Sequence, residues 1–302
     1  MNRPKMIMMC GLVGSGKSDE AKRLAEQYNA NIHASDNIRE ELSGDINNQN
    51  INDLVFKTLH NRIKEDLCNG KNCIYDATNI NYKKRMAFLQ ELKNIPCKKI
   101  CVLMATPYEV CLERNTKRNR TVPEDVIKRM YMKFDPPWYY EGWNDIIIMY
   151  YGEVYRYPHS FYLATKNFNQ HNTHHTLTLG EHCAEVCAAL NNTTEELKTA
   201  GLLHDCGKPF CKTFKNAKGE ITEQAHYYNH EHSGSYDSLF YRKDFPNKID
   251  PLYISILIRW HMQPYYWEKD NNEKLHNKCR KLWGEELYKD IMKLHEADRA
   301  AH

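Results

Sequence analysis

The sequence lacks several features that would assign it to a specialised class of protein. It has no apolar run near the ~18 residues of a membrane-spanning helix, so we expect no membrane span. Its net charge is only +3 over 302 residues, which excludes a polycationic chain and leaves nucleic-acid contacts to a local patch such as residues 115–120. It also lacks internal repeats and low-complexity runs. With 41% hydrophobic and 27% charged residues, it has the composition of a globular protein long enough for two domains.

Paired cysteines are also missing. The chain has eleven cysteines, but none forms a C-x-x-C pair, and the closest spacings are 97/101 and 183/187. Residues 1–14 mimic a secretory signal, with basic residues before a short apolar run. That run is too short and leads directly into a glycine-rich loop, so we interpret it as a buried first strand. These features predict a reduced, cytoplasmic protein.

The first half of the chain alternates apolar strands with helical segments. We expect strands at 5–13, 72–78 and 97–105, and helices at 17–29 and 54–70. Strands that alternate with helices predict parallel β-α units and a doubly wound α/β sheet.

The pattern changes after this half. A connector rich in proline and aromatic residues covers 134–145, and the short apolar segment 146–151 follows it. From about Thr173 onward the pattern is helical without competing β alternation, which predicts an all-α second domain. We place the two domains at 1–155 and 156–302.

A glycine-rich loop carries the clearest functional motif. Residues 11–18, GLVGSGKS, match G-x-x-x-x-G-K-[ST] between an expected strand and an expected helix, as that motif requires. The glycines let backbone N–H groups converge on the phosphates of ATP or another NTP, Lys17 adds charge, and Ser18 is expected to bind Mg²⁺. The candidate phosphate-binding residues are Gly11, Gly14, Ser15, Gly16, Lys17 and Ser18.

Further polar residues narrow the reaction. Asp36 follows a short apolar stretch, with Arg39 one turn later, and a carboxylate beside the γ-phosphate can accept a proton from an attacking hydroxyl. Asp76 ends an expected strand in a Walker-B-like position. Arg114 and Arg118, four residues apart, are predicted to share a helix face above the phosphates. Singly, Asp36 also fits an N-cap and Arg114 a surface residue, but the ordered set favours a small kinase over a motor ATPase.

Together with the loop, the segments SDNIREEL, YDATN, ERNTKR and TVPEDVIKRM resemble the polynucleotide 5′-hydroxyl kinase family of the P-loop fold, over about residues 5–140. The resemblance implies that Lys17 and Ser18 bind phosphate and metal, and that Asp36 is the general base for the 5′-hydroxyl. It also implies that Arg39 contacts the 3′ phosphate of the acceptor, and that Arg114 and Arg118 are lid arginines on the donor phosphates. Arg120 is a third lid candidate, so which two act stays open.

Histidine is concentrated in the second half, where 12 of the 15 lie at or after His171. A lone histidine on an apolar face is more often a core residue than a ligand, but several histidines with inward aspartates are costly to bury unless they bind something. Imidazole and carboxylate ligands suit Zn²⁺, Mn²⁺, Fe, Co or Ni, and a bound ion supplies a hydroxide nucleophile near neutral pH. The candidates are His182, His204, Asp205, His230, His261 and Asp298.

The order H…HD…H…H…D resembles the HD phosphohydrolase superfamily over about residues 170–302. The resemblance implies that His182, His204, Asp205 and Asp298 hold one divalent transition metal, and that His230 and His261 extend the site to two metals bridged by Asp205. A mononuclear site stays open, and His226 and His232 compete with His230. Lys208 either contacts substrate phosphate or is a solvated lysine. His174 and His175 either line the substrate mouth or are loop residues.

The two halves together predict a bifunctional enzyme that heals nucleic-acid ends, in RNA repair. One half would be an ATP-dependent 5′-hydroxyl polynucleotide kinase, and the other a metal-dependent 2′,3′-phosphatase or cyclic phosphodiesterase. RNA ends, with DNA ends as an alternative, would be the substrate, and a nucleic-acid ligase would act downstream. Two alternatives are a small-molecule kinase joined to a nucleotidase in nucleotide metabolism, and an ATP-switched binding protein. Some known fusions place the HD module first, whereas here the kinase leads. The sequence does not indicate an oligomeric state.

Overall fold

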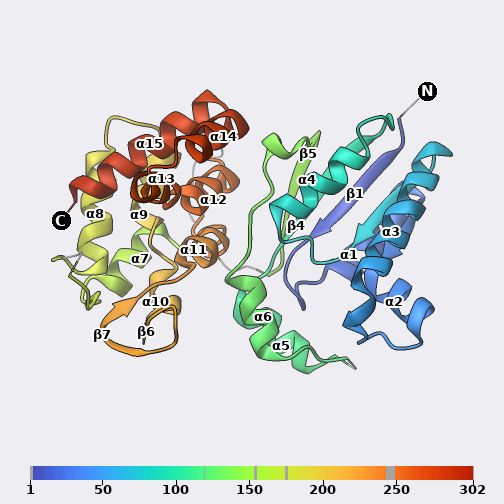
Figure 1. Cartoon of the computed structure of the whole chain (residues 1–302), viewed down its shortest axis with the longest axis horizontal. Coiled ribbons are helices and arrows are strands. Elements are labelled where there is room, and N and C mark those ends of the chain that lie inside the picture. Colours follow the sequence, from blue (N-terminus) through green and yellow to red (C-terminus); the bar gives the residue numbers. More distant parts are fainter. Residues whose placement is uncertain (1–2, 119, 153–154, 174–175, 243–248, 302) are drawn as a thin grey trace. The chain divides into compact units, whose positions relative to one another are not determined.

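The computed structural model describes residues 3–118, 120–152, 155–173, 176–242 and 249–301. It divides the chain into two units, which Figure 1 shows in the colours of the sequence. Unit 1 comprises Met1–Met130 and Pro137–Glu153, and unit 2 comprises Tyr131–Pro136 and Val154–His302. The chain thus contributes a short segment to unit 2 before it returns to unit 1, and nothing in the sequence pattern indicated this excursion. Within the described ranges, no helix has the length and apolar character needed to cross a membrane.

Unit 1 is built on a five-stranded sheet in the order β2-β3-β1-β4-β5, and every neighbouring pair is parallel. The strands are β1 (Lys5–Cys10), β2 (Ala30–Ala34), β3 (Asn72–Asp76), β4 (Lys98–Ala105) and β5 (Asp145–Tyr150). The predicted parallel α/β sheet is therefore confirmed. β1 ends three residues before the expected position, because Gly11 begins the loop that leads into the first helix.

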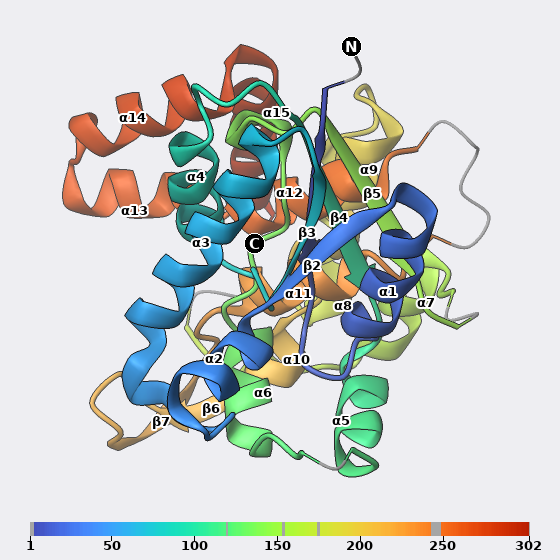
Figure 2. The same cartoon turned by 90° about the vertical axis from the view of Figure 1, so that its right-hand side faces the viewer.

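Helices cover both faces of this sheet, with α1 on one face and α3 and α4 on the other (Figure 2). The helices of unit 1 are α1 (Lys17–Tyr28), α2 (Ser35–Ser43), α3 (Asn52–Cys68), α4 (Tyr82–Glu91), α5 (Tyr108–Thr116) and α6 (Glu124–Tyr131), with 3-10 turns η1 (Gln49–Ile51) and η2 (Tyr139–Glu141). Because helices cover both faces, the central strands are apolar throughout instead of alternating with polar residues.

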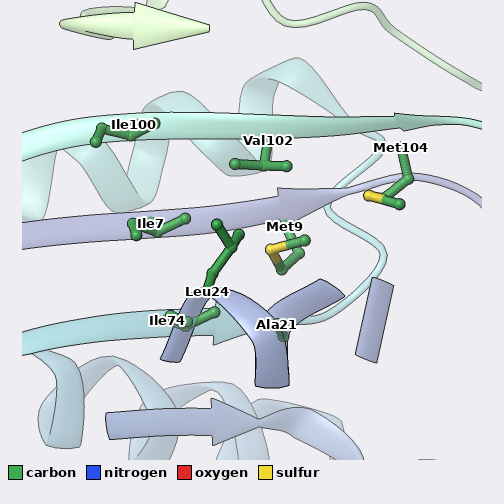
Figure 3. Close-up of a cluster of buried hydrophobic side chains, with 8 residues drawn as sticks. All are labelled: Ile7, Met9, Ala21, Leu24, Ile74, Ile100, Val102 and Met104. Carbon is green, nitrogen blue, oxygen red and sulfur yellow. The ribbon is translucent and has the colours of Figure 1, made fainter. Parts of the chain in front are cut away.

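Alternating side chains of the central strands form two cores. On the α1 side, Ile7 and Met9 of β1 pack with Ala21 and Leu24 of α1 (Figure 3). On the opposite side, the ring of Tyr75 meets that of Phe88 of α4 edge to face, with centroids 5.2 Å apart. Parallel strands end at one edge of the sheet, so this packing sets the segments that follow β1, β2, β3 and β4 at a common edge.

Unit 2 is predominantly helical. Its helices are α7 (Pro158–Thr165), α8 (Leu179–Ala189), α9 (Glu195–Leu203), α10 (Lys208–Cys211), α11 (His230–Ser238), α12 (Pro251–Trp260), α13 (Gln263–Asp270), α14 (Glu273–Trp283) and α15 (Glu285–Ala300). It also contains an antiparallel hairpin, β6 (Thr213–Lys215) and β7 (Ile221–His226), so the expectation of no strands in this half was wrong in that detail. Most residues of the hairpin are exposed or half-buried, and such short strands carry no apolar alternation to predict them from.

Candidate active sites

The glycine-rich loop connects β1 to α1 at the carboxyl edge of the sheet. Gly14 and Gly16 have φ values of +81° and +91°, which favour glycine. A Cβ at Gly14 would also overlap the carbonyl oxygen of Cys111 in α5. The Thr106 hydroxyl donates to the Ser15 carbonyl oxygen at 2.9 Å and holds the loop against the end of β4. The loop therefore has the strained, close-packed backbone that phosphate binding requires.

Two charged side chains, Lys17 and Asp76, accompany this loop. Lys17 begins α1 and donates from Nζ to the Leu12 carbonyl oxygen at 2.7 Å. Asp76, the last residue of β3, is buried, and the Ser18 side chain lowers the pKa of its carboxyl. Burial lowers the pKa of Lys17 and raises the pKa of Asp76, and the opposite charge of each opposes the shift of the other. This hydroxyl, carboxylate and lysine suit an NTP with Mg²⁺.

The predicted base, Asp36, lies in the first turn of α2, just after β2. It is not the N-cap of that helix, because Ala34 holds the N-cap position and makes no side-chain capping bond. The Asp36 side chain is 43% exposed, and its Oδ1 accepts a bond from Arg39 Nη1 at 2.9 Å. Arg39 is itself buried and donates from Nη2 to Asn52 Oδ1 at 2.7 Å. The carboxylate is thus partly exposed, and Arg39 holds one of its two oxygens.

The three lid arginines occupy different places. The prediction that Arg114 and Arg118 share a helix face is wrong, because α5 ends at Thr116. Beyond it, the Asn115 amide pairs with the backbone of Val122 in both directions, at 2.8 and 2.9 Å, and folds the chain back.

Arg114 lies beside the phosphate loop. The Arg114 guanidinium sits 3.4 Å above the ring of Tyr151, with Nη1 3.6 Å from the position of a Cβ at Gly16. Burial dominates the pKa shifts of Lys17 and Asp76. The charge of Arg118 lowers both pKa values, so it adds to the shift of Lys17 and opposes that of Asp76.

Arg120 instead reaches Asp36. Its Nη1 donates to Asp36 Oδ2 at 2.6 Å, and its Nε donates to Asn47 Oδ1 at 2.9 Å.

In unit 2, the structure brings all six predicted metal ligands together. His182 belongs to α8, His204 caps α9 and precedes Asp205, His230 begins α11, His261 caps α12, and Asp298 belongs to α15. All six side chains are buried. Their ligand atoms form one group of His182, His204 and Asp298 and another of Asp205, His230 and His261, with the atoms of each group within 4.8 Å of one another. Helices distant in sequence therefore build a single charged cluster.

Each of the four histidines is oriented in the same way. Their Nδ1 atoms lie 2.6–3.0 Å from carbonyl oxygens of Ala301, Gly201, Tyr227 and Ile258, for His182, His204, His230 and His261 respectively. A carbonyl oxygen only accepts, so Nδ1 carries the proton and a neutral ring presents its lone pair at Nε2. This arrangement of Nδ1 on a carbonyl is typical of metal-binding histidines.

The inward nitrogen atoms meet in pairs. His182 Nε2 lies 3.2 Å from His204 Nε2, and His230 Nε2 lies 3.2 Å from His261 Nε2. Asp205 faces both pairs, with Oδ2 3.3 Å from His204 Nε2 and Oδ1 3.1 Å from His230 Nε2. Two facing lone pairs repel unless a cation lies between or beside them. The donor set therefore fits two divalent ions that share Asp205.

The electrostatics of the cluster favour positive charge at its His204 side. Burial alone would lower the pKa of His204, but Asp205 and Asp298 raise it well above its usual value. Burial together with the neighbouring His230 and His204 lowers the pKa of His261 to about 3, so that ring stays neutral. The same carboxylates that stabilise a proton would stabilise a metal ion.

Other side chains surround this cluster. Lys208 is buried, with Nζ 2.6 Å from Asp205 Oδ2 and 2.8 Å from Gln170 Oε1, so the alternative of a solvated lysine was wrong. The Tyr265 hydroxyl donates to Asp298 Oδ2 at 3.0 Å. Sequence reasoning missed Gln170 and Tyr265, because no motif or spacing marks a residue that contacts a ligand from a separate helix or loop.

The structure also separates His230 from its competitors. His226 lies in β7 and stacks on Tyr228, with ring centroids 5.5 Å apart. His232 Nδ1 faces the Phe134 carbonyl oxygen at 2.8 Å, away from the cluster. His174 and His175 fall outside the described residues.

Fold and site together define a P-loop α/β kinase domain followed by a helical HD domain. Residues 6–137 match the family described as "AAA domain", and residues 173–301 match the family described as "HD domain". Each match covers less than half of the chain, and the two matched segments lie in different halves.

Individual known proteins resemble only part of the chain. The L-seryl-tRNA(Sec) kinase of Methanococcus maripaludis is 31% identical over 144 residues, which are 46% of this chain and 56% of that kinase. The chain therefore spans little more than half the length of this curated relative.

Solved structures resemble it more weakly. A kinase candidate from Chloroflexus aurantiacus has a TM-score of 0.43 at 16% identity, over 49% of this chain and 89% of its own. A chain of the Pnkp1/Rnl/Hen1 RNA repair complex has a TM-score of 0.37 at 21% identity, over 43% of each chain.

Proposed function

We propose that the protein heals broken nucleic-acid ends, as a 5′-hydroxyl polynucleotide kinase joined to a metal-dependent 2′,3′-phosphatase or cyclic phosphodiesterase. The observation that carries the proposal is the presence, in one chain, of residue sets for two opposite reactions of phosphate. One set is built to add a phosphoryl group and the other to remove one. RNA cleavage that leaves a 5′-hydroxyl and a 2′,3′-cyclic phosphate creates two ends that need these two reactions before a ligase can join them.

In the kinase half, the loop backbone, Lys17 and Ser18 hold the NTP phosphates, with Asp76 beside the Mg²⁺ position. Asp36 takes the proton of the attacking 5′-hydroxyl while the γ-phosphoryl group moves from the β,γ-bridging oxygen of the NTP to the hydroxyl oxygen, and the nucleoside diphosphate leaves. Arg39 binds the phosphate on the 3′ side of the acceptor nucleotide. The name of the curated relative describes a kinase of a tRNA-borne seryl group, which supports an acceptor hydroxyl carried by RNA.

In the HD half, His182, His204, Asp205 and Asp298 would hold one divalent ion, and Asp205, His230 and His261 would hold a second. Such ions, when bound, supply a hydroxide at neutral pH and neutralise phosphate charge. The four backbone carbonyls would keep the Nε2 lone pairs available to such ions, and Tyr265 fixes the carboxylate of Asp298. Lys208, whose Nζ lies 2.6 Å from Asp205 Oδ2, would contact a phosphate oxygen of the substrate.

Two assays on the full chain test the proposal. With γ-labelled ATP, label should pass to a 5′-hydroxyl RNA oligonucleotide, and Asp36→Ala should abolish transfer while ATP binding persists. Separately, the protein with added Mn²⁺, Ni²⁺, Co²⁺ or Mg²⁺ should release phosphate from 2′,3′-cyclic ends, and His204→Ala with Asp205→Ala should abolish release but leave the kinase intact. Labelled mononucleotide beside unlabelled oligonucleotide would instead support the nucleotide-metabolism alternative. Hydrolysis that survives the double substitution would refute the metal assignment.

A further inference from the structure

We propose that Arg120, in the segment between α5 and α6, belongs to the acceptor side of the kinase site, where it positions Asp36 and adds positive charge beside the acceptor phosphate that Arg39 binds. This inference rests on the proposed kinase function and assigns Arg120 a role different from that of Arg114 and Arg118.

The first step is the symmetry of the contacts on Asp36. Oδ1 accepts from Arg39 at 2.9 Å, and Oδ2 accepts from Arg120 at 2.6 Å. A carboxylate with one guanidinium on each oxygen has a fixed plane, because rotation would break a charge-assisted bond. Each oxygen keeps a further lone pair, so the carboxylate can still accept a proton from a hydroxyl.

The second step is how Arg120 is anchored. Its Nε donates to Asn47 Oδ1 at 2.9 Å, and Asn47 lies in the connection between α2 and η1, on the acceptor side of the site. The paired amide of Asn115 and backbone of Val122 hold both ends of the loop that carries Arg120. Arg120 therefore bridges the lid loop to the segment that follows the Asp36 helix.

The third step separates Arg120 from the other two lid arginines. Arg114 stacks on Tyr151, with Nη1 3.6 Å from the position of a Cβ at Gly16 in the phosphate loop, and the family resemblance assigns Arg118 to the donor phosphates as well. Within the described part of the chain, Arg120 is the lid arginine that contacts Asp36. The donor phosphates and the acceptor are thus served by different arginines.

These positions also define the acceptor. Two guanidinium groups that flank one carboxylate leave net positive charge beside the base, and this charge attracts a phosphate. Acceptors with a phosphate near the hydroxyl, such as a nucleoside 3′-phosphate or a polynucleotide end, satisfy that charge. A nucleoside or sugar without phosphate does not.

The test compares Arg120→Gln with Arg118→Gln in two separate measurements on the full chain. In the first, the affinity for a fluorescent ATP analogue with Mg²⁺ should be unchanged by Arg120→Gln and weakened by Arg118→Gln. In the second, Arg120→Gln should raise the KM for a nucleoside 3′-phosphate by about tenfold or more, as expected for the loss of a charge-assisted bond. The KM for ATP should stay at the wild-type value.

Three further variants separate positioning from a general effect of charge or folding. Arg120→Lys keeps the charge without the fork and should restore only part of the acceptor KM, and Asn47→Ala, which frees the Arg120 anchor, should raise it in part. Lys117→Ala removes a neighbouring cation whose ion pair, within the described residues, is with Glu113, and should behave as wild type. The acceptor preference gives an independent readout, because Arg120→Gln should reduce the preference for a nucleoside 3′-phosphate over the bare nucleoside.

Two results would overturn the inference. One is a weaker ATP-analogue affinity in Arg120→Gln, which would place Arg120 on the donor side whatever the acceptor is. The other is an unchanged acceptor KM. Failure of the proposed function has a different signature, in which the wild-type protein binds the ATP analogue but phosphorylates neither oligonucleotide nor nucleoside 3′-phosphate. In that case the analogue measurement still decides on which side Arg120 lies.

Discussion

Gly207 lies where the turn after Asp205 meets the backbone of α11, and replacing it with alanine tests how the HD cluster is assembled. A Cβ at this position would lie 2.6 Å from the backbone nitrogen of Gly234 and closer still to the carbonyl oxygen of His230. The φ of Gly207 is −79°, which alanine adopts freely, so the change tests close approach and adds no backbone strain.

The expected effect follows from these distances. Contacts of a Cβ with backbone atoms stay at or above 3.0 Å, so Gly234 must retreat by at least 0.4 Å, the difference between 3.0 and 2.6 Å, and His230 by more. His230 Nε2 now lies 3.1 Å from Asp205 Oδ1, so the shift separates two of the ligands proposed for a second ion. We expect an overpacking cost of about 1–3 kcal/mol. A displacement of this kind at a reacting centre predicts a loss of about 10²-fold in phosphohydrolase kcat.

Metal content by mass spectrometry, phosphate release and kinase activity together measure this outcome. Gly207→Ala should lose up to one bound ion and most hydrolysis while the kinase is unaffected. Gly219→Asn is the control, because Gly219 has φ +86°, which asparagine tolerates, and open space at the Cβ position. Wild-type metal content and hydrolysis in Gly207→Ala would refute the idea that the close approach of α11 sets the place of His230.

Two predictions concern the kinase unit. Arg85→Met should lower the free energy of unfolding, measured by urea unfolding, by about 3–5 kcal/mol. The buried carboxylate of Glu141, now bonded to Arg85 at 2.6 and 2.8 Å, would lose its partner charge. A second change in the same chain, Glu141→Leu, should recover most of the loss. Burial lowers the pKa of His60 despite the neighbouring Glu91, so the unfolded chain takes up this proton first and stability should fall as the pH drops below about 6.5. His60→Gln should flatten that part of the pH profile, and an unchanged slope would show that His60 does not cause it.

Much of the architecture could be predicted because it depends on local signals. The phosphate loop, the strands that flank it and the helical second half all follow from motif and periodicity, and the parallel sheet and the HD domain were confirmed. The hairpin β6–β7 could not be predicted, because its strands are short and mostly exposed. The helical continuation to Arg118 was wrong because the side chain of Asn115 bonds the backbone of Val122, a contact that no pattern of hydrophobic residues encodes.

The candidate sites divide in the same way. Residue types and their order were enough to nominate Lys17, Asp36 and the histidines, since phosphate and metal chemistry restricts which side chains can serve. Neither type nor order could choose among Arg114, Arg118 and Arg120, or among neighbouring histidines. Those choices depend on where a side chain points after the chain has folded.

The sequence by itself indicated the two kinds of chemistry in this protein. The glycine spacing of the loop is a local motif for phosphate binding, and histidines with aspartates on apolar helices are costly to bury unless they bind something. Only the tertiary structure decided which side chains of the two sites contact one another. It set Arg120 on Asp36, brought Asp205 between two histidine pairs, and buried Lys208 beside it. The first two of these arrangements join segments far apart in the chain, and the burial of Lys208 depends on how the helices of unit 2 pack. No local pattern in the sequence encodes either.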